Sequence, residues 1–131
     1  RGARARGGSV AAMALDWREP IGQQQSVASE DFGGANDPLE AEVILAVETV
    51  WLIDLIRPFV DTAVAVMRGS RRPRCYFING ERAQADSKSF AKMADVIAAF
   101  EASGCSTRQI HEAPSDEPGK PTKVFEIALL R

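Results

Sequence analysis

Apolar residues follow two patterns along this chain: short unbroken runs, which are typical of buried strands, and stripes at helical spacing. The runs predict strands at residues 9–15, 42–47, 75–79 and 124–130, and a further strand is expected at residues 106–111 before the last of them. The stripes predict one helix over residues 58–68, opened by Pro58, and a second helix that begins near Asp86 or Ser87 and ends at Gly104. This order of elements predicts a single α/β domain.

The run at residues 43–47 is the most informative one, because an acidic residue and an aromatic residue follow it. The five positions are all apolar and rich in β-branched side chains, as expected of a strand covered on both faces. Glu48 comes next, and Trp51 follows three positions later. Ligands bind at the carboxyl ends of strands in open α/β sheets, so both side chains are candidates for a site. The alternative is an ordinary strand-to-helix junction with a surface glutamate.

Two segments are predicted to be loops between secondary-structure elements. Residues 18–40 are rich in Gln, Ser, Gly, Asn and Asp, which predicts a loop or insertion longer than compact domains normally use. Residues 112–122 show no helical pattern. We therefore expect the two strands that they join to be antiparallel neighbours.

Charge and composition limit the partners, metals and locations that we expect for this chain. The chain of 131 residues has a net charge of −2, and its arginine clusters at the start and at residues 68–74 lie in Gly- or Pro-containing loops, so we expect no nucleic-acid partner. Charges interrupt the apolar stretch at residues 43–67, so we expect no membrane span. Cys75, Cys105 and His111 lack metal-ligand spacing and are assigned to packing, with no metal. Reduced thiols fit a location in the cytoplasm or the nucleus.

Three short motifs point to a family. They are Leu15-Asp16-Trp17, the run ILAVETVW at residues 44–51, and Arg82 after the strand at 75–79. Together they resemble the class I, seven-β-strand S-adenosylmethionine-dependent protein lysine methyltransferases of the methyltransferase-like group. By this resemblance the chain is the C-terminal portion of a Rossmann-like methyltransferase sheet. Residues 9–17 supply the third strand region, 18–40 a loop or insertion, and 41–131 the fourth to seventh strands with their helices.

The resemblance implies methyl transfer from S-adenosylmethionine to a lysine of a protein substrate. Glu48 and Trp51, which replace the family's Asp and Tyr, would be catalytic and hold the lysine. Arg82 would orient the substrate or pair with a neighbouring glutamate. The residues implied to contact the cofactor are Asp16, Trp17 and Ala46. The alternatives are that Trp17 covers the core and that Trp51 is the first buried residue of the next segment.

One part of the family pattern is absent from the sequence. A glycine-rich turn after the first strand and an acidic residue after the second would hold the cofactor, and neither precedes Asp16. We therefore expect the first two strands to be missing and the numbering to start inside a longer reading frame. In the family's sheet order of 3-2-1-4-5-7-6, the strand before Glu48 then becomes an exposed edge. A small-molecule methyltransferase and a non-catalytic module that binds through this edge are the alternatives.

Overall fold

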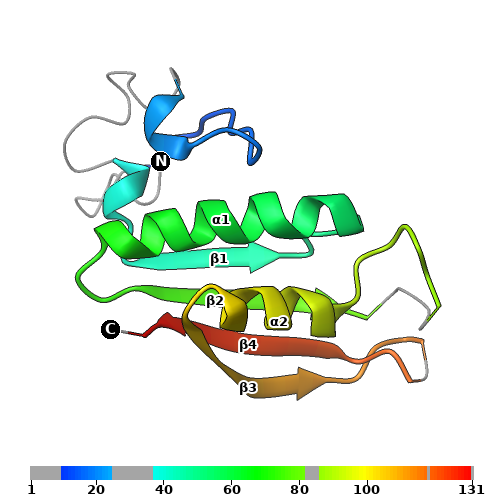
Figure 1. Cartoon of the computed structure of the whole chain (residues 1–131). Coiled ribbons are helices and arrows are strands. Elements are labelled where there is room, and N and C mark those ends of the chain that lie inside the picture. The colour runs from blue at the N-terminus through cyan, green and yellow to red at the C-terminus, as the bar shows by residue number, and fades with distance from the viewer. Residues whose placement is uncertain (1–9, 25–36, 82–85, 118, 131) are drawn as a thin grey trace.

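A four-stranded mixed sheet with two helices forms the centre of the protein (Figure 1). The structure is a computed structural model that describes residues 10–24, 37–81, 86–117 and 119–130. The elements in chain order are the 3-10 turns η2 (Ile21–Gln23) and η5 (Pro38–Glu40), then β1 (Val43–Val47), α1 (Ile53–Gly69), β2 (Arg74–Gly80), α2 (Met93–Ala102), β3 (Cys105–Ala113) and β4 (Thr122–Leu129). The predicted α/β class is confirmed.

The strands lie in the order β1-β2-β4-β3. β1 and β2 are parallel, whereas β4 runs antiparallel between β2 and β3. The final two strands are therefore antiparallel neighbours, as predicted. Among the described residues β1 pairs only with β2, so its other side is an edge of the sheet.

Both helices pack on the same face of the sheet, and the core lies between them and the strands (Figure 1). The ring of Phe59 on α1 contacts three other aromatic rings of this core. Its centroid lies 5.1 Å from that of Trp17, 6.2 Å from that of Phe77 on β2 and 5.9 Å from that of Phe100 on α2. Burial of each large apolar side chain contributes about 1.5–3 kcal/mol, so this cluster is a main source of stability.

The prediction that β1 is covered on both faces is wrong. Ala46 is 2% exposed, but Val43, Leu45 and Val47 are 52%, 68% and 52% exposed. Successive side chains of a strand point to opposite faces, and both helices lie on the Ala46 side. In the described part of the chain, the second face of β1 is an open apolar surface.

Helix α1 begins at Ile53, five residues before the predicted start at Pro58. A proline inside a helix removes one hydrogen bond, here the bond to the carbonyl of Asp54. The helix continues through it because its buried face, which includes Ile56 and Phe59, packs against the sheet from the first turn on. Tertiary burial therefore outweighs the local preference of proline for a helix start.

Helix α2 begins later than predicted. Its N-cap is Lys92, and Asp86 and Ser87 lie outside the helix. The backbone N–H of Met93 donates to the carboxylate of Glu81 at 3.1 Å, which satisfies a free donor of the first turn. Phe90, expected in the apolar stripe of this helix, is 54% exposed.

The N-terminal segment differs most from expectation. Residues 10–15, which were predicted as a strand, form neither strand nor helix. The chain instead runs past α1, held there by the ring of Trp17 on Phe59. The described parts of the predicted loop at 18–40 contain the turns η2 and η5, the second of them capped by Asp37. No helix in the described ranges is long and apolar enough to cross a bilayer.

Candidate functional site

The carboxylate of Glu48 lies between the ends of the two parallel strands. Glu48 directly follows β1 and has a φ of 51°, the left-handed region that residues other than glycine rarely adopt. Its N–H donates to the carbonyl of Ile78 at 2.9 Å, and its Oε1 accepts from the N–H of Gly80 at 2.8 Å. The strained backbone and the hydrogen bond together aim the side chain across the carboxyl ends of β1 and β2. Strain of this kind occurs often at functional sites.

Trp51 is fixed against the same residue. Its indole Nε1–H donates to the carbonyl of Glu48 at 2.9 Å, while the ring remains 52% exposed. The indole therefore has a defined place beside the carboxylate and still presents part of its surface to solvent. An exposed, positioned aromatic ring of this kind can contact a ligand.

Glu48 and Trp51 line one small pocket with a cavity volume of about 30 Å³. The other lining residues are Val50, Asn79, Gly80, Phe90 and Ala91. Among the described residues, the lining thus holds one carboxylate, one amide and two aromatic rings, with no Lys, Arg or His. This composition favours a positively charged group over an anion.

Asn79 adds an acceptor to this pocket. Its Nδ2 donates to the carbonyl of Gly80 at 3.2 Å, but its buried Oδ1 has no hydrogen-bond partner among the described residues. A buried polar atom without a partner carries a free-energy cost. A donor placed in the pocket could remove that cost if it reaches the oxygen.

Two loops bound the pocket, and they are joined to each other. Leu52 and Phe90 form an isolated antiparallel bridge. The N–H of Ile53 donates to the carbonyl of Ser89 at 3.0 Å, and the N–H of Ala91 donates to the carbonyl of Trp51 at 2.8 Å. The loop after β1 and the loop before α2, which carry Trp51 and Phe90, are therefore joined by backbone hydrogen bonds.

A second hollow adjoins the first and is largely acidic. The two share Glu48 and Gly80, and the remaining lining of the second is Glu81, Ser115, Asp116, Glu117, Lys120 and Thr122. Lys120 Nζ lies 3.2 Å from the carboxylate of Glu117, so one of these charges is balanced. The surface next to the pocket is suited to positively charged neighbours of a bound group.

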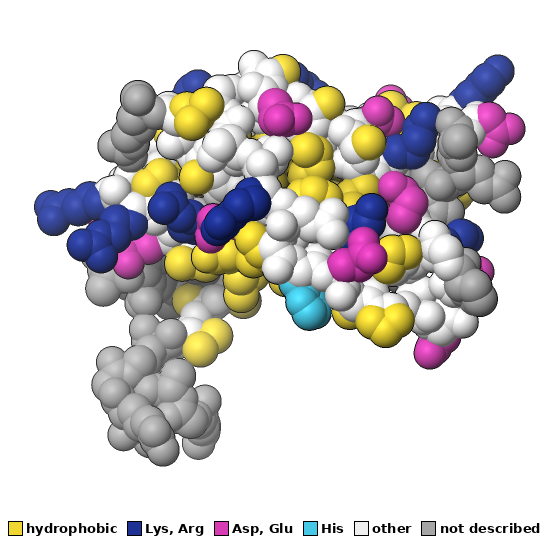
Figure 2. Space-filling model, turned by 90° about the horizontal axis from the view of Figure 1, so that it is seen from below, with side chains coloured by type: hydrophobic (Ala, Val, Ile, Leu, Met, Phe, Trp, Pro, Cys, Tyr) yellow, Lys and Arg dark blue, Asp and Glu magenta, His cyan; other side chains and the backbone are white. Residues whose placement is uncertain are grey.

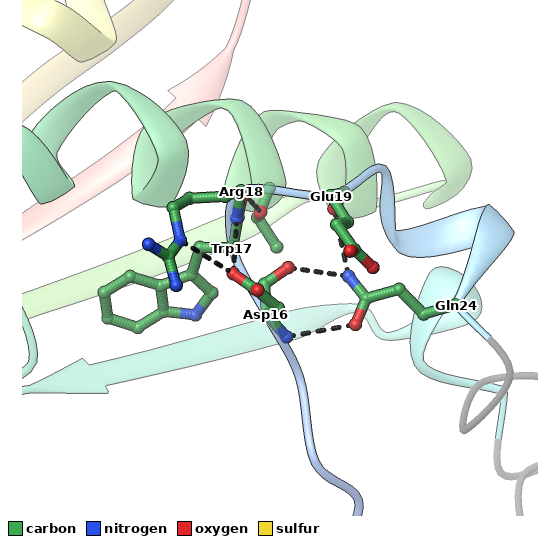
Figure 3. Close-up of polar contacts among 6 residues, drawn as sticks. Asp16, Trp17, Arg18, Glu19 and Gln24 are labelled. Atoms are coloured by element: carbon green, nitrogen blue, oxygen red, sulfur yellow. Dashed lines mark hydrogen bonds and ion pairs between the residues drawn. The ribbon is translucent and has the colours of Figure 1, made fainter.

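Asp16 and Trp17 lie elsewhere, along α1 (Figure 3). The ring of Trp17 packs edge-on against Phe59, and its carbonyl accepts from Thr62 Oγ1 at 3.3 Å. The Asp16 carboxylate accepts from Arg18 N at 2.9 Å and Arg18 Nε at 3.3 Å. The backbone hydrogen bond from Arg18, followed by the side-chain one, lowers the pKa of Asp16 below its usual value.

Gln24 closes this N-terminal turn, a role that the sequence did not reveal. Its amide donates to the carbonyls of Asp16 at 2.7 Å and Glu19 at 3.0 Å and accepts from Asp16 N at 3.0 Å (Figure 3). The side chain is only 9% exposed. Nothing in its polar sequence neighbourhood distinguishes it from a solvated loop residue.

The structure thus brings together only part of the predicted site. Glu48 and Trp51 share the pocket, whereas Trp17 lines a different hollow with residues of α1 and the side chain of Ala46 lies in the core. Arg82 lies outside the described residues. Five lining residues were not predicted as site residues: Val50, Asn79, Gly80, Phe90 and Ala91.

The remaining candidate groups lie outside the pocket. Cys75 and Cys105 are buried free thiols, and burial raises the pKa of Cys75 to about 12. No cluster of three or more potential metal ligands occurs within the described ranges. No protein-family profile matches the sequence, and the comparison with curated proteins gave no match either.

Proposed function

We propose that the sheet is the C-terminal part of a class I S-adenosylmethionine-dependent methyltransferase and that the Glu48 pocket receives a lysine side chain of a protein substrate. One observation carries this proposal. The carboxyl ends of β1 and β2 place a carboxylate, a buried amide oxygen and two aromatic rings around one hollow, and none of the described residues that line it is basic. Ligands of open α/β sheets bind at this end of the strands.

The sheet topology supports the family part of the proposal. The order β1-β2-β4-β3, with β4 antiparallel between its neighbours, corresponds to the fourth, fifth, seventh and sixth strands of the family's sheet. The side of β1 that no described strand pairs is where the first half of that sheet would join. A shared topology does not by itself give a function, so the pocket chemistry remains the main support.

The pocket residues would act chiefly on the amine. Glu48 would hold a lysine ammonium by a charge-assisted hydrogen bond and then accept the proton that the amine must lose. The faces of Trp51 and Phe90 would attract the cation, each contact contributing about 0.5–2 kcal/mol, and would limit access of water. The acidic residues Glu81 and Asp116 in the adjoining hollow favour a substrate segment with further basic residues.

S-adenosylmethionine would supply the electrophilic methyl group, but the described residues do not form a complete site for it. Asp16 and Trp17 lie along α1, and Ala46 is buried in the core. The proposal therefore assigns the rest of the cofactor site to strands that would pair with β1. Asp16 and Trp17 would contact the adenine only if the segment before them joined that larger sheet.

The open edge of β1 also favours a second candidate function. A strand with exposed Val43, Leu45 and Val47 and an unpaired side can add a strand from a partner. In this alternative the chain is a non-catalytic interaction module. It predicts partner binding that does not depend on Glu48.

Amine binding is the first test. The probe is N-acetyl-lysine methyl ester, and the matched control ligand is N-acetyl-norleucine methyl ester, which lacks the ammonium. In a ¹⁵N NMR titration we expect the lysine probe to shift the Trp51 indole and Gly80 amide signals, and we expect Glu48→Gln to weaken binding roughly fivefold or more. Glu101→Gln, on the exposed side of α2, is the control variant. Equal shifts with both ligands would refute the assigned pocket.

The family assignment has a separate test. The coding sequence ahead of Arg1 should contain a glycine-rich turn and an acidic residue, each after a predicted strand. An initiating methionine directly before Arg1 would contradict the assignment and favour the interaction module.

A further inference from the structure

The loop between α1 and β2 gathers arginines at the end of the sheet opposite the Glu48 pocket. Three of them line an open hollow at the start of β1 and β2, together with Glu42, Val43, Pro73 and Leu129; the three are Arg71, Arg72 and Arg74. Figure 2 shows Lys and Arg side chains gathered at the left end of this face, the end at which Figure 1 places the α1–β2 loop. We call this hollow and its three arginines the arginine hollow.

Few carboxylates of the described residues balance the positive charges of the arginine hollow. No ion pair links Arg71 or Arg72 to a carboxylate in the parts of the chain that are described. Arg74 donates to the carbonyl of Pro73 at 2.9 Å. It also helps to lower the pKa of Glu126, an effect due first to the hydrogen bond from Arg108. Of the described residues in the lining, only Glu42 carries a carboxylate.

Three other arginines on the described surface are paired with carboxylates. Arg18, Arg57 and Arg108 each lie within 3.3 Å of a carboxylate, that of Asp16, Asp61 and Glu126 respectively. Among the described residues, the exposed guanidinium groups of Arg71 and Arg72 in the α1–β2 loop lack such a partner, as does that of Arg68 at the end of α1. The backbone of this loop is held by the N–H of Arg72, which donates to Ser70 Oγ at 3.3 Å. The groups thus project from a defined loop.

We propose that the arginine hollow binds an acidic, partly apolar segment of another protein. Guanidinium groups bind carboxylates with matched, two-pronged geometry. Val43 and Leu129 provide apolar surface beside the charges, so spaced carboxylates with apolar neighbours fit this lining. A nucleic acid fits less well, because the described part of the lining offers no aromatic ring for base stacking and the chain carries a net charge of −2. This inference does not depend on the methyl-transfer proposal.

Fluorescence anisotropy with a labelled peptide of alternating Glu and Val residues tests the proposal, with the Gln-for-Glu peptide as the control ligand. We expect binding to the acidic peptide at low salt and weaker binding at high salt. Arg71→Gln with Arg72→Gln should weaken it roughly tenfold. Arg18→Gln with Arg57→Gln removes the same charge elsewhere and should leave the affinity within roughly twofold.

A charge reversal separates lost binding from lost folding. The variant with Arg71→Glu and Arg72→Glu should lose the acidic peptide and bind a Lys-Val peptide instead, which an unfolded chain would not do selectively. No binding of the acidic peptide, or equal loss in both Gln variants, would overturn the proposal. Tighter, Arg71-dependent binding of single-stranded DNA of equal charge would also overturn it and would assign the hollow to nucleic acid.

Discussion

The backbone N–H of Gly80 holds the carboxylate of Glu48 by a hydrogen bond of 2.8 Å that spans 32 positions of the sequence. The last residue of β2 thus positions the acidic residue that follows β1. A Cβ atom at Gly80 would lie 3.3 Å from Glu48 Oε1, closer than ordinary contact. The absence of a side chain at position 80 is therefore part of what places the acid.

Gly80→Ala should disturb the pocket while leaving the fold intact. The added methyl group would push the carboxylate by a few tenths of an ångström, so we expect weaker binding of the lysine probe in the NMR titration. Stability to urea should fall by no more than about 1 kcal/mol, because only a side-chain end has to move. Gly22→Ala is the matched control, since its Cβ would meet Leu39 at an ordinary 3.8 Å. Unchanged probe binding in Gly80→Ala would contradict the role assigned to this contact.

The two tryptophans should differ in their contribution to stability. Trp17→Ala removes the ring that packs on Phe59 and should lower the free energy of unfolding by about 1–3 kcal/mol. Trp51→Ala removes a half-exposed ring and should cost less than about 1 kcal/mol, while reducing binding of the lysine probe. Urea denaturation of both variants measures the difference. Equal losses would show that Trp17 does not anchor the N-terminal segment.

Cys75 should make the protein less stable in alkaline solution. Burial raises its pKa from 9.0 to about 12, so between these values the unfolded chain loses the thiol proton while the folded chain keeps it. The contribution of this thiol to the free energy of unfolding is then constant below about pH 8 and falls by up to about 1.4 kcal/mol per pH unit above pH 9. Urea denaturation at about pH 8 and about pH 10.5 measures the loss, and subtraction of the same loss in Cys75→Ala isolates this thiol. The prediction fails if both proteins lose the same stability.

Strands were easier to predict from the sequence than helix starts. The apolar runs identified β1, β2 and β4, whereas the run at residues 9–15 forms no strand in its described part and β3 is mostly polar and exposed. The start of α1 was missed because burial of its first turns outweighs the local effect of Pro58. The start of α2 was missed because the segment before it pairs with the loop after β1, a contact between distant parts of the chain.

Only the site residues that follow a single strand in the sequence could be predicted. Glu48 and Trp51 stood out because they directly follow a buried run. Asn79 and Gly80 join them because Val47 of β1 lies opposite Ile78 of β2, a register that sequence patterns do not fix. Phe90 reaches the same pocket only through its pairing with Leu52, so no local pattern could place it there.

The bridge between Leu52 and Phe90 has a consequence for how the pocket meets a ligand. Separating the two loops would break the backbone hydrogen bonds that Ile53 and Ala91 donate. The backbone that carries the two rings is therefore preorganised on both sides of the pocket. For the proposed lysine ligand this means that binding does not first have to order the two loops, which would otherwise cost affinity.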